Sequence, residues 1–372
     1  MPIVANTYSY VVGVDTHAAS HTYTVIECPS GAVIDQATFP TSSAGLGRAM
    51  NWIARGALAP TGGDLDAVLI AVEGTGSYGA VLSARLSDAG YRVVEAPTPT
   101  RARGRGKSDD LDALAAARSS LSMDLDALRD RRGTTSSNDQ LRGALAVLVT
   151  AREQLNAERL RAINALTALV RTHDLGLDAR RRLTSAQIEQ VSRWRARVEP
   201  LAATVARTQA VRLARRIIDL DADLVANHDH IADLLTTHAP AQSRALLEAR
   251  GVGAIVAATV LVAWGHPGRI RSEAALAMIA GTAPIPASSG NTTRHRLNRG
   301  GDRRLNKAIN TIVLTRLRTD PQTRDYAERR RAEGKTDREI RRCLKRYITR
   351  QLHRTLTSAT PGTLQAHAPA AA

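Results

Sequence analysis

The chain has 372 residues, 43% of them hydrophobic, and this length exceeds what one ordinary hydrophobic core organises, so two or three domains are expected. The two cysteines, Cys28 and Cys343, are too far apart for a zinc-binding spacing. No apolar run is long enough to span a bilayer, and the N-terminus lacks a signal-peptide pattern. These features predict a reduced, cytoplasmic protein with no membrane partner.

The net charge of +16 is unevenly distributed along the chain. Residues 1–110 hold 8 Lys and Arg against 10 Asp and Glu, a net charge of −2, whereas the remainder holds 43 against 25, a net charge of +18. Lysine occurs at only four positions, so the positive charge is mostly arginine, whose planar fork binds phosphate in a bidentate way. The asymmetry indicates a nucleic-acid partner, although basic residues can also serve solubility.

The first part of the chain predicts an α/β domain. Residues 10–27 indicate two strands joined by a turn, because "YVVGVD" is apolar and "HTYTVIE" alternates. A third strand, an amphipathic helix, a buried strand, a second helix, another strand and a further helix follow over 33–40, 42–58, 66–74, 77–90, 91–97 and 109–121. Three hairpin-like strands followed by alternating helices and strands predict the mixed sheet of the RNase H-like architecture.

The remainder of the chain predicts helices. The stretch from 140 to 170 carries apolar residues at coiled-coil spacing, and a second long helical pattern runs from Glu199 to His238, so the two form an antiparallel helical arm. From Ser243 onward we expect a buried helix after Gly251-Val252-Gly253 and basic helices over 303–318 and 336–356. The predicted divisions are an α/β domain, a linker with a coiled-coil arm, a mainly helical C-terminal domain and a low-complexity tail expected to be disordered, over 1–122, 123–242, 243–357 and 358–372.

Four acidic residues stand at positions that packing alone does not explain. Asp15 and Glu73 each end a buried strand, and Asp109 and Asp112 lie on one face at the start of a helix. Four converging carboxylates repel one another unless cations neutralise them, and two Mg²⁺ ions about 4 Å apart suit phosphoryl transfer. The alternative is that these acids are caps or surface residues, Asp109 in particular.

A loop beside a basic run is the second candidate site. Ser288-Ser289-Gly290 reads locally as a turn, and it leads into a series of arginines. The predicted phosphate-binding residues, which could instead form a solvated basic face, are Arg294, Arg296, Arg299, Arg303, Arg304 and Lys307 with Arg101, Arg103, Arg105 and Lys107. Since aromatic residues make up 3% of the chain, we do not expect base-stacking platforms.

The motifs resemble those of a known family in their order and spacing. They are "GVDTHAASHTYTVI", "VEGTGSYG", "KSDDLDALAAA", "RGVGAIVAATVLVAWG" and "AGTAPIPASSGNTTRHRLNRGGDRRLNKAI". From about residue 10 to 355 the chain is similar to the IS110-family transposases, also called bridge-RNA-guided recombinases. The resemblance implies a RuvC-like domain whose Asp-Glu-Asp-Asp tetrad is Asp15, Glu73, Asp109 and Asp112, and a C-terminal transposase domain whose nucleophile is Ser289.

The resemblance also implies partners. Members of the family are expected to act as homo-oligomers, tetramers built from dimers, in which the RuvC-like domain of one subunit faces the serine of another. A structured noncoding guide RNA is expected to pair with donor and target DNA. Ser108 stands where threonine is common in the family, and Gly74 where alanine is usual; neither change affects the tetrad.

The expected function is therefore that of a DNA transposase or recombinase acting through a serine–phosphate intermediate. One alternative is a RuvC-type metal-dependent nuclease or junction resolvase, in which water attacks the phosphate and Ser289 only shapes a loop. Another is a non-enzymatic nucleic-acid-binding protein with a decayed acidic site. Trapping a covalent adduct between protein and DNA distinguishes the first reading from the second, and loss of all activity in Asp15→Asn would count against the third.

Overall fold

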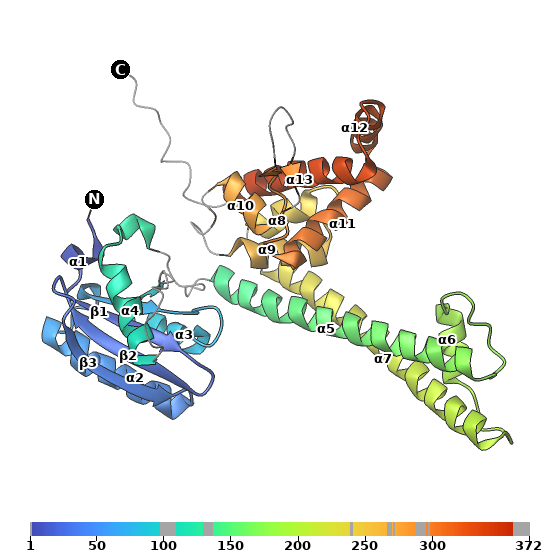
Figure 1. Ribbon diagram of the computed structural model, residues 1–372, viewed down its shortest axis with the longest axis horizontal. Helices are drawn as coiled ribbons and strands as arrows, with labels where there is room; N and C mark the ends of the chain where they lie inside the picture. Colours follow the sequence, from blue (N-terminus) through green and yellow to red (C-terminus); the bar gives the residue numbers. More distant parts are fainter. Residues whose placement is uncertain are drawn as a thin grey trace. The chain divides into compact units, whose positions relative to one another are not determined.

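The chain divides into two compact units, Met1–Gln140 and Leu141–Ala372 (Figure 1). The computed structural model describes residues 2–96, 109–128, 137–238, 241–265, 270, 272–287, 295–296 and 298–359, with backbone alone for 109–110 and 137–139. None of the helices in these ranges is long and apolar enough to cross a membrane. The predicted tail, residues 358–372, lies outside the described residues beyond Ala359.

A five-stranded mixed sheet forms the centre of the first unit. Its strands are β1 (Tyr10–Thr16), β2 (Ser20–Glu27), β3 (Val33–Pro40), β4 (Val68–Val72) and β5 (Arg92–Glu95). Their order is β3-β2-β1-β4-β5, in which β1, β2 and β3 are antiparallel and β1, β4 and β5 are parallel. The predicted mixed α/β sheet is thus confirmed, strand by strand.

Helices cover both faces of this sheet. One face packs against α2 (Ser43–Ile53), which continues as a π-helical turn (Ala54–Leu58), and against α3 (Ala80–Asp88). The other face packs against α4 (Asp109–Leu121) and the short α1 (Val4–Thr7). Short 3-10 turns occur at Ala59–Thr61, Leu65–Ala67 and Leu125–Ala127.

The alternation of side chains along β1 explains these two layers. Val12 and Val14 are fully buried with the side chains of α2 and α3, whereas Val11 is fully buried with those of α4. Successive residues of a strand point to opposite faces, so Gly13 and Asp15 belong to the α4 side together with Val11. This alternation determines that Asp15, near the end of β1, lies on the face of the sheet that packs against α4.

Two long helices dominate the first part of the second unit. They are α5 (Ser137–Thr172) and α7 (Leu201–Thr237), and they lie side by side in Figure 1 with α6 (Ser185–Ser192) between them in sequence. An apolar cluster that includes Leu166, Ile188 and Ile217 joins all three helices. The two predicted long helices and the break between them are confirmed.

Polar contacts join the middle of α5 to α7. Arg152 Nη1 donates to Leu224 O at 2.8 Å, and Asn227 Nδ2 donates to Leu148 O at 3.0 Å. Arg159 forms an ion pair with Asp221. Because buried polar groups demand specific partners, these contacts select one alignment of the two helices.

The remaining helices pack around a single core, into which the first residues of α5 and the last of α7 also insert. They are α8 (Ala241–Glu248), α9 (Ala254–Trp264), α10 (Glu273–Ile279), α11 (Arg303–Thr319), α12 (Pro321–Ala332) and α13 (Asp337–Ser358). The expected buried helix is α9, and the expected basic helices are α11 and α13. The sequence reading did not predict α12 or the small hairpin of β6 (Ile285–Pro286) and β7 (His295–Arg296).

Candidate active site

Two acidic residues become neighbours at one edge of the sheet in the first unit. Asp15 lies one residue before the end of β1, and Glu73 directly follows β4. The two strands are parallel with Val14 opposite Val72, and Glu73 N donates to Val14 O at 2.9 Å. The carboxylates therefore start from adjacent positions on the two central strands.

Gly13 brings the start of α4 against the same edge. A Cβ built on Gly13 would lie 2.2 Å from Ala113 O and 2.6 Å from Ala117 N, so the helix backbone rests directly on β1. Only a residue without a side chain permits that approach. Asp112 immediately precedes Ala113 and is half-buried, and Asp109 is the first residue of α4.

Three of the four predicted acids, Asp15, Glu73 and Asp112, lie close enough for the charges of the other two to act on Glu73. Burial raises the pKa of the Glu73 carboxyl, and the negative charges of Asp15, Asp112 and Glu95 raise it further, in that order. The charge of His17 acts in the opposite direction. Like charges held together in a partly buried site disfavour ionisation, which is how paired carboxylates at reactive centres differ from surface acids.

Glu95 is a member of this cluster that the sequence reading missed. It is the last residue of β5 and accepts hydrogen bonds from Gly74 N and Thr75 N, both at 3.2 Å, and from the Thr75 hydroxyl. Gly74 has a φ of +71°, which favours glycine, and Thr16 Oγ1 donates to Glu73 O at 2.7 Å. Glu95 and Thr16 thus hold the turn that carries Glu73. The sequence could have indicated Glu95, because "YRVVE" is another predicted strand that ends in an acid.

The acidic residues at this edge of the sheet have the donor chemistry of a divalent-metal site. Asp15 is 5% exposed, and its Oδ2 lies 3.0 Å from Nε2 of His17, a second residue that the sequence reading missed. Among the described side chains, no three His, Cys, Asp or Glu groups close around one point that could hold an ion. The chemistry of the donors nevertheless fits, because hard carboxylate oxygens are the ligands that Mg²⁺ takes, and the Asp109 side chain falls outside the described part.

In the second unit, glycines and an aspartate cap hold the residues that follow the serine loop. Asp302 N donates to Ile279 O at 2.6 Å, and the Asp302 side chain accepts from Arg304 N and Leu305 N at the start of α11. Gly301 has a φ of +94°, and a Cβ there would lie 2.4 Å from Ile279 O. The chain after β7 is thus fastened to the end of α10.

A basic cavity of about 1030 Å³ lies between these segments and α12 and α13. Its described lining includes residues 281–284 and 295–296, which flank the serine loop in sequence. The cations that the sequence reading missed here are Arg329, Arg330, Lys335, Arg342, Lys345, Arg346 and Arg350. Arg342, Lys345, Arg346 and Arg350 come from α13, which was predicted only as a basic helix, whereas Arg329 and Arg330 come from α12, which was not predicted. No local motif marked the face that these cations share.

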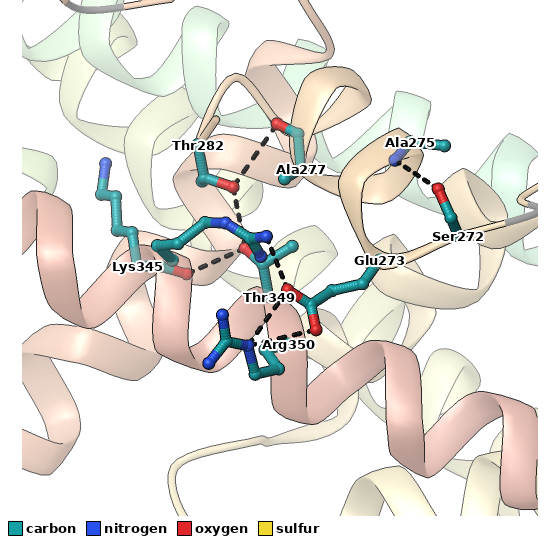
Figure 2. Close-up of polar contacts among 9 residues, drawn as sticks. Ser272, Glu273, Ala275, Ala277, Thr282, Lys345, Thr349 and Arg350 are labelled. Carbon is teal, nitrogen blue, oxygen red and sulfur yellow. Dashed lines mark hydrogen bonds and ion pairs between the residues drawn. The ribbon is translucent and has the colours of Figure 1, made fainter. Parts of the chain in front are cut away.

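The interface between α10 and α13 lies next to this cavity. Glu273 of α10 contacts Arg350 Nε at 3.0 Å and Arg346 Nη2 at 2.5 Å, and these bonds lower the pKa of the Glu273 carboxyl, with the Arg350 hydrogen bond the largest cause. Thr282 and Thr349 share a hydrogen bond of 2.9 Å. Figure 2 shows Glu273 directed at Arg350 and Thr282 directed at Thr349, so the segment before the serine loop is bound to α13.

The predicted phosphate-binding residues do not share one environment. Ser289 and Arg294 lie outside the described residues, as do Arg101, Arg103, Arg105 and Lys107. Arg296 lines the basic cavity. Arg304 instead forms an ion pair of 2.7 Å with Glu153 of α5. Arg299, Arg303 and Lys307 are exposed.

Comparisons with known proteins agree with this arrangement. A profile for the DEDD transposases of IS110 elements, described as "Transposase", matches residues 12–173, and a second profile, "Transposase IS116/IS110/IS902 family", matches residues 243–328. The first match spans the sheet and its acids, and the second spans the segments around the serine loop. The class of protein that these two matches define is a transposase of the DEDD type, and the mixed sheet of the first unit suits that class.

The chain belongs to the IS110 family of transposases. It is 29% identical over 265 residues to an uncharacterised 42 kDa protein of insertion element IS900 from Mycobacterium paratuberculosis, covering 60% of this chain and 64% of that protein. It is 28% identical over 320 residues to an uncharacterised 43.6 kDa protein of insertion element IS110 from Streptomyces coelicolor, covering 72% of this chain and 76% of that protein.

Proposed function

We propose that this protein is the transposase of an insertion sequence and exchanges DNA strands through a serine–phosphate intermediate. The observation that carries the proposal is the convergence of Asp15, Glu73 and Asp112 at one edge of an RNase H-like sheet, where the charges of the other two raise the pKa of Glu73. A set of carboxylates whose negative charges oppose one another in this way is typical of a site for phosphoryl transfer rather than a packing feature.

The acids would hold divalent cations against the DNA phosphate. Asp15, Glu73, Asp109 and Asp112 are the proposed ligands, and bound Mg²⁺ would neutralise charge on the phosphate and lower the pKa of a nearby hydroxyl. The protein itself contributes the geometry: Gly13 lets α4 reach β1, and Glu95 holds the turn after β4. We propose two Mg²⁺ ions per site, following the number of carboxylates.

The nucleophile in this proposal is Ser289. Its Oγ attacks phosphorus, the phosphodiester bond to the neighbouring sugar oxygen breaks, and that oxygen leaves as a hydroxyl with a proton. A hydroxyl of a second DNA strand then attacks the serine ester, which joins the new strand and restores the serine. One ester bond replaces another at each step, so no ATP is needed. Arg296 and the other basic residues near the loop would hold neighbouring phosphates.

Trapping the intermediate tests this proposal. Full-length protein is incubated with labelled DNA carrying an element end, a noncoding RNA transcribed from that element, and Mg²⁺, and denaturing gels then reveal protein bound covalently to DNA. We expect Ser289→Ala to abolish the adduct and Ser288→Ala to retain it. Strand exchange that persists in Ser289→Ala would leave the alternative, a RuvC-type nuclease that uses water.

The acidic site and the serine loop belong to different units of the chain, which suits an active site shared between subunits. We propose a homo-oligomer, a tetramer of two dimers, in which one subunit's acids act with another subunit's serine. Mixing Asp15→Asn protein with Ser289→Ala protein then restores activity that each variant alone lacks. No recovery in the mixture would place the whole site within one subunit.

We further propose that a structured noncoding RNA from the same element pairs with donor and target DNA. The basic charge of residues beyond 110 supports a partner held by its backbone, with base pairing supplying the sequence readout. Changing the target-pairing bases of the RNA should redirect insertion to a DNA that matches the new bases. Insertion that ignores this change would indicate a recombinase that reads DNA by protein contacts alone.

A further inference from the structure

The basic cavity of the second unit has more positive charge than the protein itself balances. Of the described residues that line it, eight are arginine or lysine and only Glu339 is acidic. Glu273 pairs with Arg346 and Arg350 from outside the lining. Within the described part of the chain, Arg296 and Arg342 have no carboxylate as an ion-pair partner, so the cavity retains a strong attraction for anions.

One of these cations, the Lys345 ammonium, is partly removed from water. Lys345 is half-buried, and its Nζ donates to Asn306 Oδ1 at 2.9 Å. Burial, followed by the charge of Arg341, lowers the pKa of the Lys345 ammonium. A phosphate in the cavity would supply the negative charge that this environment lacks.

Two tyrosines give the cavity a second kind of surface. Tyr326 and Tyr347 line it with ring centroids 5.8 Å apart and ring planes inclined at 73°. Tyr347 is 55% exposed, although the whole chain has only 7 tyrosines, 3 tryptophans and 1 phenylalanine. An exposed aromatic ring among arginines matches the surfaces that bind single strands, which combine a base on an aromatic face with phosphates on cations.

We propose that this cavity binds a short unpaired segment of nucleic acid, with a base stacked on Tyr347 and flanking phosphates contacting Arg342 and Arg296. The volume of about 1030 Å³ suits a few nucleotides rather than a duplex, whose bases are already stacked on one another. The inference rests on the proposed function in one respect, because strand exchange must generate unpaired DNA. It differs from the expectation, drawn from composition, that the protein has no stacking platform.

Binding of short oligonucleotides to the full-length protein tests this inference without requiring catalysis. Fluorescence anisotropy with a labelled six-nucleotide DNA strand should show that Tyr347→Ala weakens binding about 5-fold to 150-fold, whereas Tyr347→Phe, which keeps the ring, stays within about 2-fold of the wild type. A DNA hairpin whose stem keeps its bases paired should be insensitive to both changes. Equal affinity of the wild type and Tyr347→Ala for the single strand would overturn the proposal.

A matched pair on α13 tests the phosphate contacts separately. Arg342 lines the cavity, and Arg338, one turn earlier on the same helix, does not, although both are exposed. Arg342→Ala should weaken single-strand binding and reduce the slope of log K against log salt by about 0.7, with Arg338→Ala as the control. Equal losses in the two variants would mean that general charge, rather than the cavity, binds the strand.

DNA and RNA oligonucleotides of the same sequence distinguish the two possible sources of the unpaired strand. Tighter binding of DNA, with the same dependence on Tyr347, supports an unpaired strand of the DNA substrate, and tighter binding of RNA supports a loop of the guide. This experiment and the serine test can fail independently. A lost adduct in Ser289→Ala together with unchanged strand binding in Tyr347→Ala refutes only the cavity proposal.

Discussion

Replacing Gly13 by alanine tests whether a missing side chain assembles the acidic site. The added Cβ would lie 2.2 Å from Ala113 O and 2.6 Å from Ala117 N, where ordinary contacts exceed about 3.4 Å. Helix α4 must therefore withdraw by roughly 1 Å. Overpacking of a core costs about 1–3 kcal/mol, and we expect the upper end of this range because both obstacles are backbone atoms that no rotamer change can move.

Hydrogen exchange measures this loss locally in the full-length protein. A destabilisation of about 3 kcal/mol corresponds to an approximately 150-fold fall in amide protection, which we expect in peptides covering β1 and α4. DNA cleavage should fall with it, because Asp112 moves with α4. The control is Gly47→Ala in α2, where a Cβ meets no atom within 4 Å and alanine stabilises the helix by about 0.5–1 kcal/mol.

The reasoning would be refuted by one result above all. If Gly13→Ala keeps wild-type protection in β1 and α4 and wild-type cleavage, then α4 does not rest on β1 as closely as the structure indicates. Protection that falls while cleavage persists would separate the packing argument from the argument about the site. Protection that falls equally in Gly47→Ala would show that the assay reports general loosening.

Three further predictions concern the polar contacts of individual side chains. Glu95→Gln removes a charged acceptor from the turn after β4, so cleavage should fall about 10-fold and exchange in that turn should rise, whereas Glu27→Gln, at the exposed end of β2, should change neither. Glu273 has a lowered pKa, so its contribution to stability is present above its ordinary value of 4.5 and is lost as the pH falls through the lowered pKa. Urea unfolding should show Glu273→Gln less stable than the wild type by about 1 kcal/mol at pH 7, with the difference vanishing in acid; a constant difference would contradict the ion-pair explanation. Asn227→Ala should cost about 1–3 kcal/mol of protection in α7, whereas Asn156→Ala, whose side chain bonds only within α5, should cost little; equal costs would argue against a specific contact between the helices.

Much of the fold was predictable because local patterns repeat over whole elements. Alternation along "HTYTVIE" and the apolar runs of β1 and β4 marked the strands, and helical spacing marked α5 and α7. The hairpin of β6 and β7 was not predictable, since two residues in each strand carry no periodicity. Helix α12 was also missed, because its sequence "PQTRDYAERRRA" has only one buried residue and hence no apolar face.

The candidate site was likewise predictable only in part from the sequence. Asp15 and Glu73 could be recognised because an acid at the end of a buried strand packs poorly, and Asp112 because it lies one helical turn from Asp109. Glu95 is also an acid at the end of a strand, but the sequence did not indicate that β5 lies beside β4. The sequence could not show that Arg304 pairs with Glu153 while Arg296 lines a cavity, since both belong to one basic run.

By itself, the sequence determined the types of element, the basic character of the chain beyond residue 110, and the acids at the ends of strands. These properties depend on residues that are close together in the chain, so they can be read directly from the amino-acid sequence. Tertiary structure alone decided that Gly13 lets α4 approach β1, that Glu95 joins the acidic cluster, and that Tyr347 and Arg342 face one cavity. Such features depend on strand order and helix packing, where residues distant in sequence become neighbours because burial and backbone hydrogen bonding are satisfied only in that arrangement.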